Sequence, residues 1–131
     1  MEKALWLRVV VLAKGNNMQL SAEQNAFLLD VSRLIEFVRN SDDGMLITGG
    51  ELFRTPEQEQ IYVDSGRSRT MNSNHLRRLA IDLNFIQNGQ IISDKETLQK
   101  YGDYWKSLNP INRWGGEFST IYDPGHYERN V

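Results

Sequence analysis

Two histidines are present in the chain, and each lies close in sequence to a carboxylate. His75 precedes Asp82 by seven residues, and His126 follows Asp123 by three. Two imidazoles and one carboxylate are the protein ligands of many catalytic zinc sites, in which water takes the fourth position. Histidines are also common as ordinary polar residues, so residue types alone leave both a zinc site and scattered polar side chains open.

The spacing of His75 and Asp82 restricts how they could share a metal. Zinc ligand atoms lie about 2 Å from the ion. Seven residues span about 10 Å along a helix and about 23 Å along a strand, where the two side chains would also face opposite sides. We therefore expect the chain to turn between them, with His75 in a loop and Asp82 on a strand at 79–85. The HExxH helix motif is absent, so this zinc site would have a different architecture.

Composition limits the possible classes of protein. The 131 residues suffice for one domain with a single core, and a hydrophobic content of 40% is ordinary for a globular protein. A net charge of −2 gives no indication of nucleic acid or an anionic membrane as partner. The absence of cysteine excludes disulfides and thiolate zinc sites. We expect residues 1–131 to form one domain, with no repeats or linkers.

The N-terminal part is expected to contain a helix that packs into the core. Ser21 and Gln24 form a capping box at its start. Apolar residues then recur at helical spacing and are expected to be core: Phe27, Val31, Leu34, Ile35 and Val38. Residues 4–13 are apolar but too few to span a membrane. Because Arg8 interrupts them, we expect a strand or packing arm there rather than a signal peptide, followed by a turn at 14–17.

Two further helices carry start and stop signals. Thr55 can cap one of them, with Pro56 in its first turn. Ser93 and Glu96 form a capping box for the other, which should end before Pro110. Strands are expected at 45–48 and 79–85, at a hairpin turning on Asn88-Gly89, and through His126 and Tyr127. These elements predict an α+β fold with a small antiparallel sheet and packed helices.

An arginine-rich stretch surrounds the polar loop at 66–71. It contains Arg67, Arg69, Arg77 and Arg78. Two interpretations stay open, a solvated loop and a binding rim for an acidic substrate such as a carboxylate-bearing peptide or a teichoic acid.

Several motifs, in order along residues 21–128, resemble the zinc peptidases of the hedgehog/D-Ala-D-Ala peptidase fold. The match looks closest to the bacteriophage L-alanyl-D-glutamate endopeptidases, which are endolysins. The motifs that carry this resemblance are Ser73-x-His75, Ala80-x-Asp82, Asp123-x-x-His126, Arg54-Thr55-Pro56-Glu57-Gln58, Asp82-Leu83-Asn84-Phe85, Tyr104-Trp105 and Arg113-Trp114-Gly115-Gly116. The chain departs from the family at Arg78, where the family often has glycine.

The resemblance implies a role for each candidate residue. The zinc ligands would be His75, Asp82 and His126. Asp123 would be the general base that accepts a proton from the attacking water, with Glu128 as its nearest competitor or as a residue supporting His126.

The remaining candidates would assist the site. Arg54 would lie beside the zinc, bind substrate and stabilise the developing oxyanion. Trp114 would lie close to the cleft, and Ser73 would orient the loop that carries His75.

The implied function is zinc-dependent hydrolysis of a peptidoglycan stem peptide, most specifically at the L-Ala–D-Glu bond. Alternatives are a D-Ala-D-Ala carboxypeptidase or dipeptidase, a non-catalytic cell-wall-binding domain with structural zinc, and, more weakly supported, a metal-dependent nuclease. The expected partner is the stem peptide, without nucleic acid or membrane insertion, and the protein is expected to be a monomer. It would be made in the cytoplasm and reach the wall after holin-type release.

Overall fold

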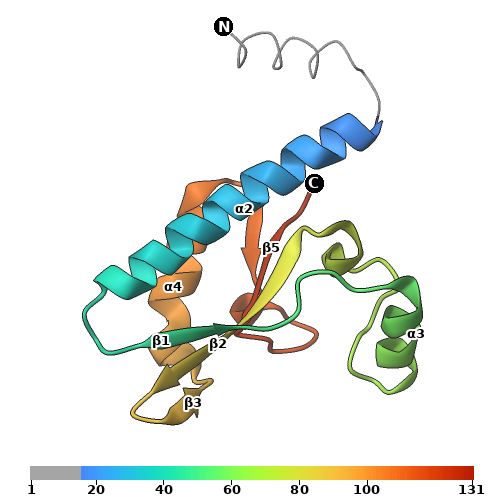
Figure 1. The fold of residues 1–131 in the computed structure, drawn as a ribbon. Helices are drawn as coiled ribbons and strands as arrows, with labels where there is room; N and C mark the ends of the chain where they lie inside the picture. The colour runs from blue at the N-terminus through green and yellow to red at the C-terminus, as the bar shows by residue number, and fades with distance from the viewer. Residues whose placement is uncertain (1–15) are drawn as a thin grey trace, which may run out of the picture.

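The central strand of the sheet, β2 (Ala80–Gln87), carries Asp82. The computed structural model describes residues 16–131 (Figure 1). The first half of β2 pairs with β5 (His126–Arg129), and its second half pairs with β1 (Leu46–Gly49) and β3 (Gln90–Ile92). β4 (Asn112–Trp114) pairs with β5. All these pairings are antiparallel. Because β2 pairs with β1 and with β5, segments that are far apart in the sequence meet at β2.

Helices complete the described part of the chain. They are α2 (Asn16–Asn40), α3 (Pro56–Asp64) and α4 (Lys95–Leu108), with two short 3-10 helices, η1 (Asn74–Arg77) and η2 (Gly115–Glu117). The expected α+β class, with a small antiparallel sheet and packed helices, is confirmed. No helix within residues 16–131 is long and apolar enough to cross a bilayer.

Alternation along the strands separates the core from the candidate site. Successive strand residues point to opposite faces of a sheet. Leu83 and Phe85 of β2 and Tyr127 of β5 are buried in the core that α2 and α4 cover. Asp82 and His126 therefore lie on the other face, on the side where η1 and α3 are found (Figure 1).

Aromatic side chains dominate the core between the helices and the sheet. Trp105 of α4 meets Phe27 and Tyr127 edge-on, at ring-centroid distances of 5.7 and 5.8 Å. Phe85 stacks on Tyr101 at 5.2 Å. Burial of each such side chain contributes about 1.5–3 kcal/mol relative to exposure. Trp105 Nε1 also donates to the carbonyls of Arg113 and Glu128, which fixes α4 against the strand that carries His126.

Helix α2 differs from its prediction in two respects. It is already helical at Asn16, so Ser21 lies inside the helix and the turn expected at 14–17 is wrong where it is described. The residues just before Ser21 have no helix breaker, so the capping signal does not start the helix. Ile35 is 43% exposed, although the other four residues of the predicted stripe are buried. The buried face is narrower than the apolar pattern suggests. Residues 4–13 lie outside the described residues.

The start of α4 and the loop that carries His75 also require correction. Asp94, rather than Ser93, caps α4, since its carboxylate accepts from the Thr97 amide at 2.9 Å. Both residue types are favoured caps, and the sequence signal was displaced by one position. His75 lies on the 3-10 helix η1 instead of an irregular loop.

The remaining boundary signals are confirmed. Thr55 caps α3 by accepting from the Gln58 amide at 3.1 Å. Asn88 and Gly89 both have positive φ, 53° and 75°, as the tight turn between β2 and β3 requires. Helix α4 ends at Leu108, two residues before Pro110.

Candidate active site

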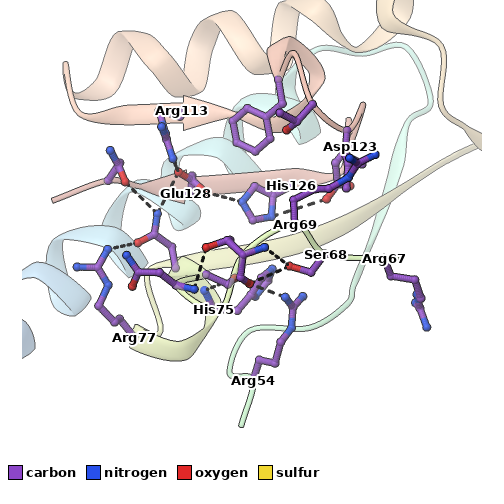
Figure 2. Close-up of a pocket in the computed structure, with 18 of the residues that line it drawn as sticks. Arg54, Arg67, Ser68, Arg69, His75, Arg77, Arg113, Asp123, His126 and Glu128 are labelled. Atoms are coloured by element: carbon purple, nitrogen blue, oxygen red, sulfur yellow. Dashed lines mark hydrogen bonds and ion pairs between the residues drawn. The ribbon is translucent and has the colours of Figure 1, made fainter. Parts of the chain in front are cut away.

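His75, Asp82 and His126 converge on one point. Their ligand atoms all lie within 4.8 Å of one another. His75 Nε2 is 3.2 Å from Asp82 Oδ1, and His126 Nδ1 is 3.3 Å from the same oxygen. The two imidazole rings stand at 67° with centroids 5.1 Å apart. Both histidines line a cleft, and Figure 2 shows them among the other side chains that line it.

Sheet register accounts for two of the three residues. Asp82 is the direct antiparallel partner of His126, so both side chains project from the same face. The third residue, His75, lies on η1. Ser73 caps the start of η1, where its side chain accepts a hydrogen bond from the His75 amide at 3.2 Å. The Arg54 amide donates to the His75 carbonyl at 3.2 Å and ties this turn to the segment before α3.

The outer nitrogen of each imidazole has a fixed partner. His75 Nδ1 lies 2.9 Å from the Leu52 carbonyl, which can only accept, so Nδ1 carries a proton. His126 Nε2 lies 2.7 Å from Glu128 Oε1 and donates to it. In the neutral rings, His75 Nε2 and His126 Nδ1 are then free to bind a cation. Such partners are typical of metal-binding histidines.

The distances from both histidines to Asp82 Oδ1 match those expected around zinc. Nitrogen and oxygen ligands lie about 2.0–2.1 Å from a tetrahedral zinc ion, which places neighbouring ligand atoms about 3.3 Å apart. The two distances to Asp82 Oδ1 are 3.2 and 3.3 Å. His75, Asp82 and His126 could therefore hold zinc through one atom each.

The charges around this point favour a cation. The pKa of Asp82 is lowered well below its usual range: burial opposes ionisation, but the hydrogen bonds and charges of His126 and His75 outweigh it. The pKa of His126 is raised to about 9, since the hydrogen bonds to Asp82 and Glu128 outweigh the opposing effect of burial.

Asp123 lies at the edge of the three-residue cluster. Its Oδ2 is 3.9 Å from His126 Nδ1, and its side chain is 51% exposed. The pKa of Asp123 is raised above its ordinary value of 3.8, mainly by partial burial and further by the charge of Asp82, against the opposing charges of His126, His75 and Arg54. A carboxylate next to the ligands, open to solvent and easier to protonate than usual, is suited to proton transfer.

The Trp114-Gly115-Gly116 segment supports the turn that carries Asp123. Trp114 is 1% exposed, so its side chain packs inside the protein, and it is not among the residues that line the cleft. Its Nε1 donates to the Pro124 carbonyl at 2.8 Å. A Cβ at Gly115 would lie 2.1 Å from the Asp123 carbonyl oxygen and 2.8 Å from His126 Cβ. Gly115 was not among the predicted site residues, although the paired glycines were a signal of close packing.

Arg54 lines the cleft but is held by two carboxylates. Its Nη1 donates to Glu59 Oε2 at 2.7 Å and to Ser73 Oγ at 3.4 Å, while Nε donates to Glu51 Oε1 at 2.5 Å. The Arg54 side chain is 11% exposed and the Glu59 side chain is fully buried. Arg54 is thus a fixed donor whose charge is largely neutralised, a feature that the sequence did not indicate.

Glu128 is fully occupied by its neighbours. It accepts from His126 Nε2 through Oε1 and from Asn74 Nδ2 and the Arg113 guanidinium through Oε2. Its side chain is 5% exposed. These contacts support a role for Glu128 in orienting His126. Because both of its carboxylate oxygens already accept hydrogen bonds, Glu128 is not placed to act as a competing base.

Three of the four arginines in the basic stretch line the cleft. They are Arg67, Arg69 and Arg77, and the cleft has a volume of about 600 Å³. Arg78 lies elsewhere, with its guanidinium 4.3 Å from the centre of the Phe53 ring. Its φ of 57° is left-handed, a conformation that glycine adopts without strain. The backbone at this position therefore has the left-handed conformation that suits glycine, although the residue is arginine.

Comparisons with known proteins bear on the fold. The sequence model of a family described as D-alanyl-D-alanine carboxypeptidase matches residues 66–129. Among solved structures, the Serratia marcescens L-Ala D-Glu endopeptidase ChiX matches with a TM-score of 0.55 and 23% identity, over 64% of this chain and 66% of that chain. No match is found among the curated proteins.

The chain has the D-Ala-D-Ala peptidase fold. The resemblance to zinc peptidases of this fold, expected from the sequence, is confirmed. The family match contains all three candidate ligands and Asp123, but it begins after Arg54. The chain spans just under two thirds of the ChiX chain, and at this level of identity the likeness establishes the peptidase fold alone.

Proposed function

We propose that this protein is a zinc-dependent hydrolase of peptidoglycan stem peptides that cleaves the L-Ala–D-Glu bond. The observation that carries the proposal is the convergence of His75, Asp82 and His126, with Asp123 beside them. Hydrolysis of an amide needs an activated water and a group that moves its proton, and this arrangement supplies ligands for the first and a base for the second.

Each residue of the site has a distinct task. His75, Asp82 and His126 would hold the ion, which supplies a Lewis acid and lowers the pKa of a water molecule towards neutrality. Asp123 accepts the proton of the attacking water and returns it to the leaving amine. Its partial exposure and its position 3.9 Å from His126 leave room for a water molecule beside it.

Arg54 assists as a positioned hydrogen-bond donor. Glu51 and Glu59 fix its guanidinium at the edge of the cleft, where it can face the carbonyl of a bound peptide. Because carboxylates pair with its charge, Arg54 would stabilise the oxyanion through the orientation of its N–H groups rather than through net charge. Ser73 accepts hydrogen bonds from both Arg54 and the His75 amide, so it holds His75 at a fixed position relative to Arg54.

The choice of bond rests on the similarity to ChiX, which is an L-Ala D-Glu endopeptidase. A D-Ala-D-Ala carboxypeptidase is the second candidate, because that activity describes the family whose model matches residues 66–129. The two candidates use the same metal chemistry and differ in which amide lies over the ion.

Product analysis tests the proposal. Purified peptidoglycan is digested with the zinc-loaded protein and the fragments are identified by mass spectrometry. We expect new amino groups on D-Glu, loss of cleavage in chelator and recovery with zinc, and no degradation of DNA. Release of free D-Ala as the sole product would establish the carboxypeptidase instead. No cleavage with zinc present would favour a non-catalytic wall-binding domain.

The resemblance to phage endolysins also leads us to propose a lytic role after holin-type release. Co-expression with a holin should then lyse susceptible cells, and expression of the protein alone should not. Lysis without the holin would show that the protein reaches the wall by another route.

A further inference from the structure

Two cavities meet at Asp123. One is the cleft of about 600 Å³ that contains His75, His126 and Asp123, which we call the arginine cleft. The other, of about 290 Å³, lies between the β2–β3 hairpin and the turn before β5, and we call it the hairpin pocket. Asp123 lines both cavities, and Asp82 lines the hairpin pocket. The two cavities therefore adjoin at Asp123, the proposed general base, and the hairpin pocket also reaches Asp82.

The arginine cleft has a local excess of positive charge. Its lining includes Arg54, Arg67, Arg69, Arg77 and Arg113 and no lysine. Carboxylates pair with the first and the last of these. Within residues 16–131, the other three form no ion pair with a carboxylate.

Arg67 and Arg69 are exposed and available to a ligand, whereas Arg77 is half-buried. Arg67 lies over the Tyr62 ring at 4.6 Å, and Arg77 donates to Asn74 Oδ1. Figure 2 shows arginines on several sides of His75, His126 and Asp123. Because the whole chain has a net charge of −2, this positive surplus is a property of the cleft rather than of the protein. Arginine forks match carboxylates well.

The hairpin pocket has the opposite character. Its described lining contains no basic residue. Leu83, Phe85, Ile92 and Pro124 contribute apolar surface, and the only acidic groups are Asp82 and Asp123 beside the metal site. A negatively charged substrate group would be repelled there, while a small apolar group would be accepted.

The stem peptide has a matching asymmetry about the L-Ala–D-Glu bond. D-Glu joins the next residue through its side chain, so its α-carboxylate is free beside the amine that cleavage releases. On the acyl side are the methyl of L-Ala and the lactyl group, without a carboxylate.

We infer that the peptide crosses the site in one direction, with the D-Glu side in the arginine cleft and the L-Ala side in the hairpin pocket. This inference rests on the proposed function and adds the orientation of the substrate. Arg67 and Arg69, both exposed on one loop, are the residues that select the D-Glu carboxylate.

Binding of fragments tests the direction without relying on cleavage. The amine-side probe is γ-D-Glu-L-Lys-D-Ala, and its matched control carries D-isoglutamine, in which the α-carboxylate is an amide. Titration calorimetry with the zinc-loaded protein should give a dissociation constant about ten-fold lower for the acid than for the amide. The double variant Arg67→Gln/Arg69→Gln should lose most of this preference.

A charge-loss control and a reverse probe complete the test. Arg39→Gln removes a charge from an exposed arginine of α2 and should leave both constants unchanged. Lactoyl-L-alaninamide, the acyl-side probe, should bind the double variant and the wild type alike. Equal binding of acid and amide, no binding of either, or dependence of the acyl-side probe on Arg67 and Arg69 would overturn the inference. Correct fragment binding without stem-peptide cleavage would instead refute the proposed hydrolysis.

Discussion

At the scale of single residues, Glu128 determines which nitrogen of His126 faces Asp82. Its carboxylate accepts from His126 Nε2 at 2.7 Å, so Nδ1 points to Asp82 Oδ1 at 3.3 Å. Asn74 and Arg113 hold Glu128 in turn. A neutral histidine free to rotate would present either nitrogen, and part of its affinity for a metal would be lost.

Glu128→Gln should therefore weaken zinc binding without emptying the site. The amide has nearly the same size but holds the Nε2 proton less strongly and leaves Arg113 without its ion pair. We expect zinc affinity to fall about 10–100-fold, as measured by competition with a chromophoric chelator. The control is Glu117→Gln, which changes a half-exposed glutamate paired with Lys106. Unchanged affinity in Glu128→Gln would show that His126 is oriented by other contacts.

At the scale of elements, the glycine at Gly115 lets η2 pack directly under the Asp123–His126 turn. The Asp123 amide donates to the Gly115 carbonyl at 3.0 Å, and the His126 amide donates to the Asp123 carbonyl at 3.1 Å. A side chain at position 115 would collide with backbone on this turn. The turn, and with it Asp123, the proposed general base, is placed by packing rather than by its own sequence alone.

Gly115→Ala should shift the Asp123–His126 turn. Its new Cβ would lie 2.1 Å from a carbonyl oxygen, so backbone must move. We expect kcat/KM on a defined stem peptide to fall by about 100-fold, the cost typical of a displacement near 1 Å. Gly49→Ala is the matched control, because its Cβ would meet nothing within 4 Å. Similar activity of the two variants would show that the turn tolerates the added methyl group.

The sequence predicted local elements better than their exact ends. Asn88-Gly89, Thr55 and Pro110 act through neighbouring residues, and the structure agrees with all three. Ser21 failed as a helix start because, within the described residues, the chain is already helical from Asn16 and residues 16–20 do not interrupt the helix.

The site was predictable in its residue types but not in its supporting contacts. The pairing of Arg54 with Glu59 is set by tertiary packing, although these residues are close in the chain. The Glu128–Asn74 contact joins residues 54 positions apart, and no local pattern specifies it.

At the scale of the whole molecule, Asp43 connects the end of α2 to α4 and the sheet. Its Oδ2 accepts from Tyr101 Oη at 2.8 Å and from Lys100 Nζ at 2.6 Å. Its Oδ1 accepts from the Met45 amide, and its carbonyl accepts from Gln87 Nε2. This small network lies away from the candidate active site and bears on stability rather than chemistry.

Asp43→Asn should reduce stability in a pH-dependent way. Burial raises the pKa of Asp43, but hydrogen bonds to Lys100, Tyr101 and Met45 outweigh it, so the folded pKa lies below 3.8. The contribution is therefore present above that value and lost as pH falls through the folded pKa. We expect a loss of about 1–3 kcal/mol in the free energy of unfolding at neutral pH.

Urea denaturation at neutral pH and at about pH 3 measures this effect, and the difference between wild type and Asp43→Asn should shrink at the lower pH. Asp103→Asn, at an exposed position on α4, serves as the control and should change stability by less than about 0.5 kcal/mol. A difference that is the same at both pH values would mean that the ionised form of Asp43 is not what stabilises the fold.

The most direct measurement is zinc content beside turnover in Asp123→Asn. The amide matches the carboxylate in size but cannot accept a proton at neutral pH, so turnover should fall about 10²–10⁴-fold. Zinc by elemental analysis should stay at one ion per chain, while His75→Ala should lose it. This outcome would establish three ligands and a separate base. Loss of zinc from Asp123→Asn, or turnover close to that of the wild type, would contradict it.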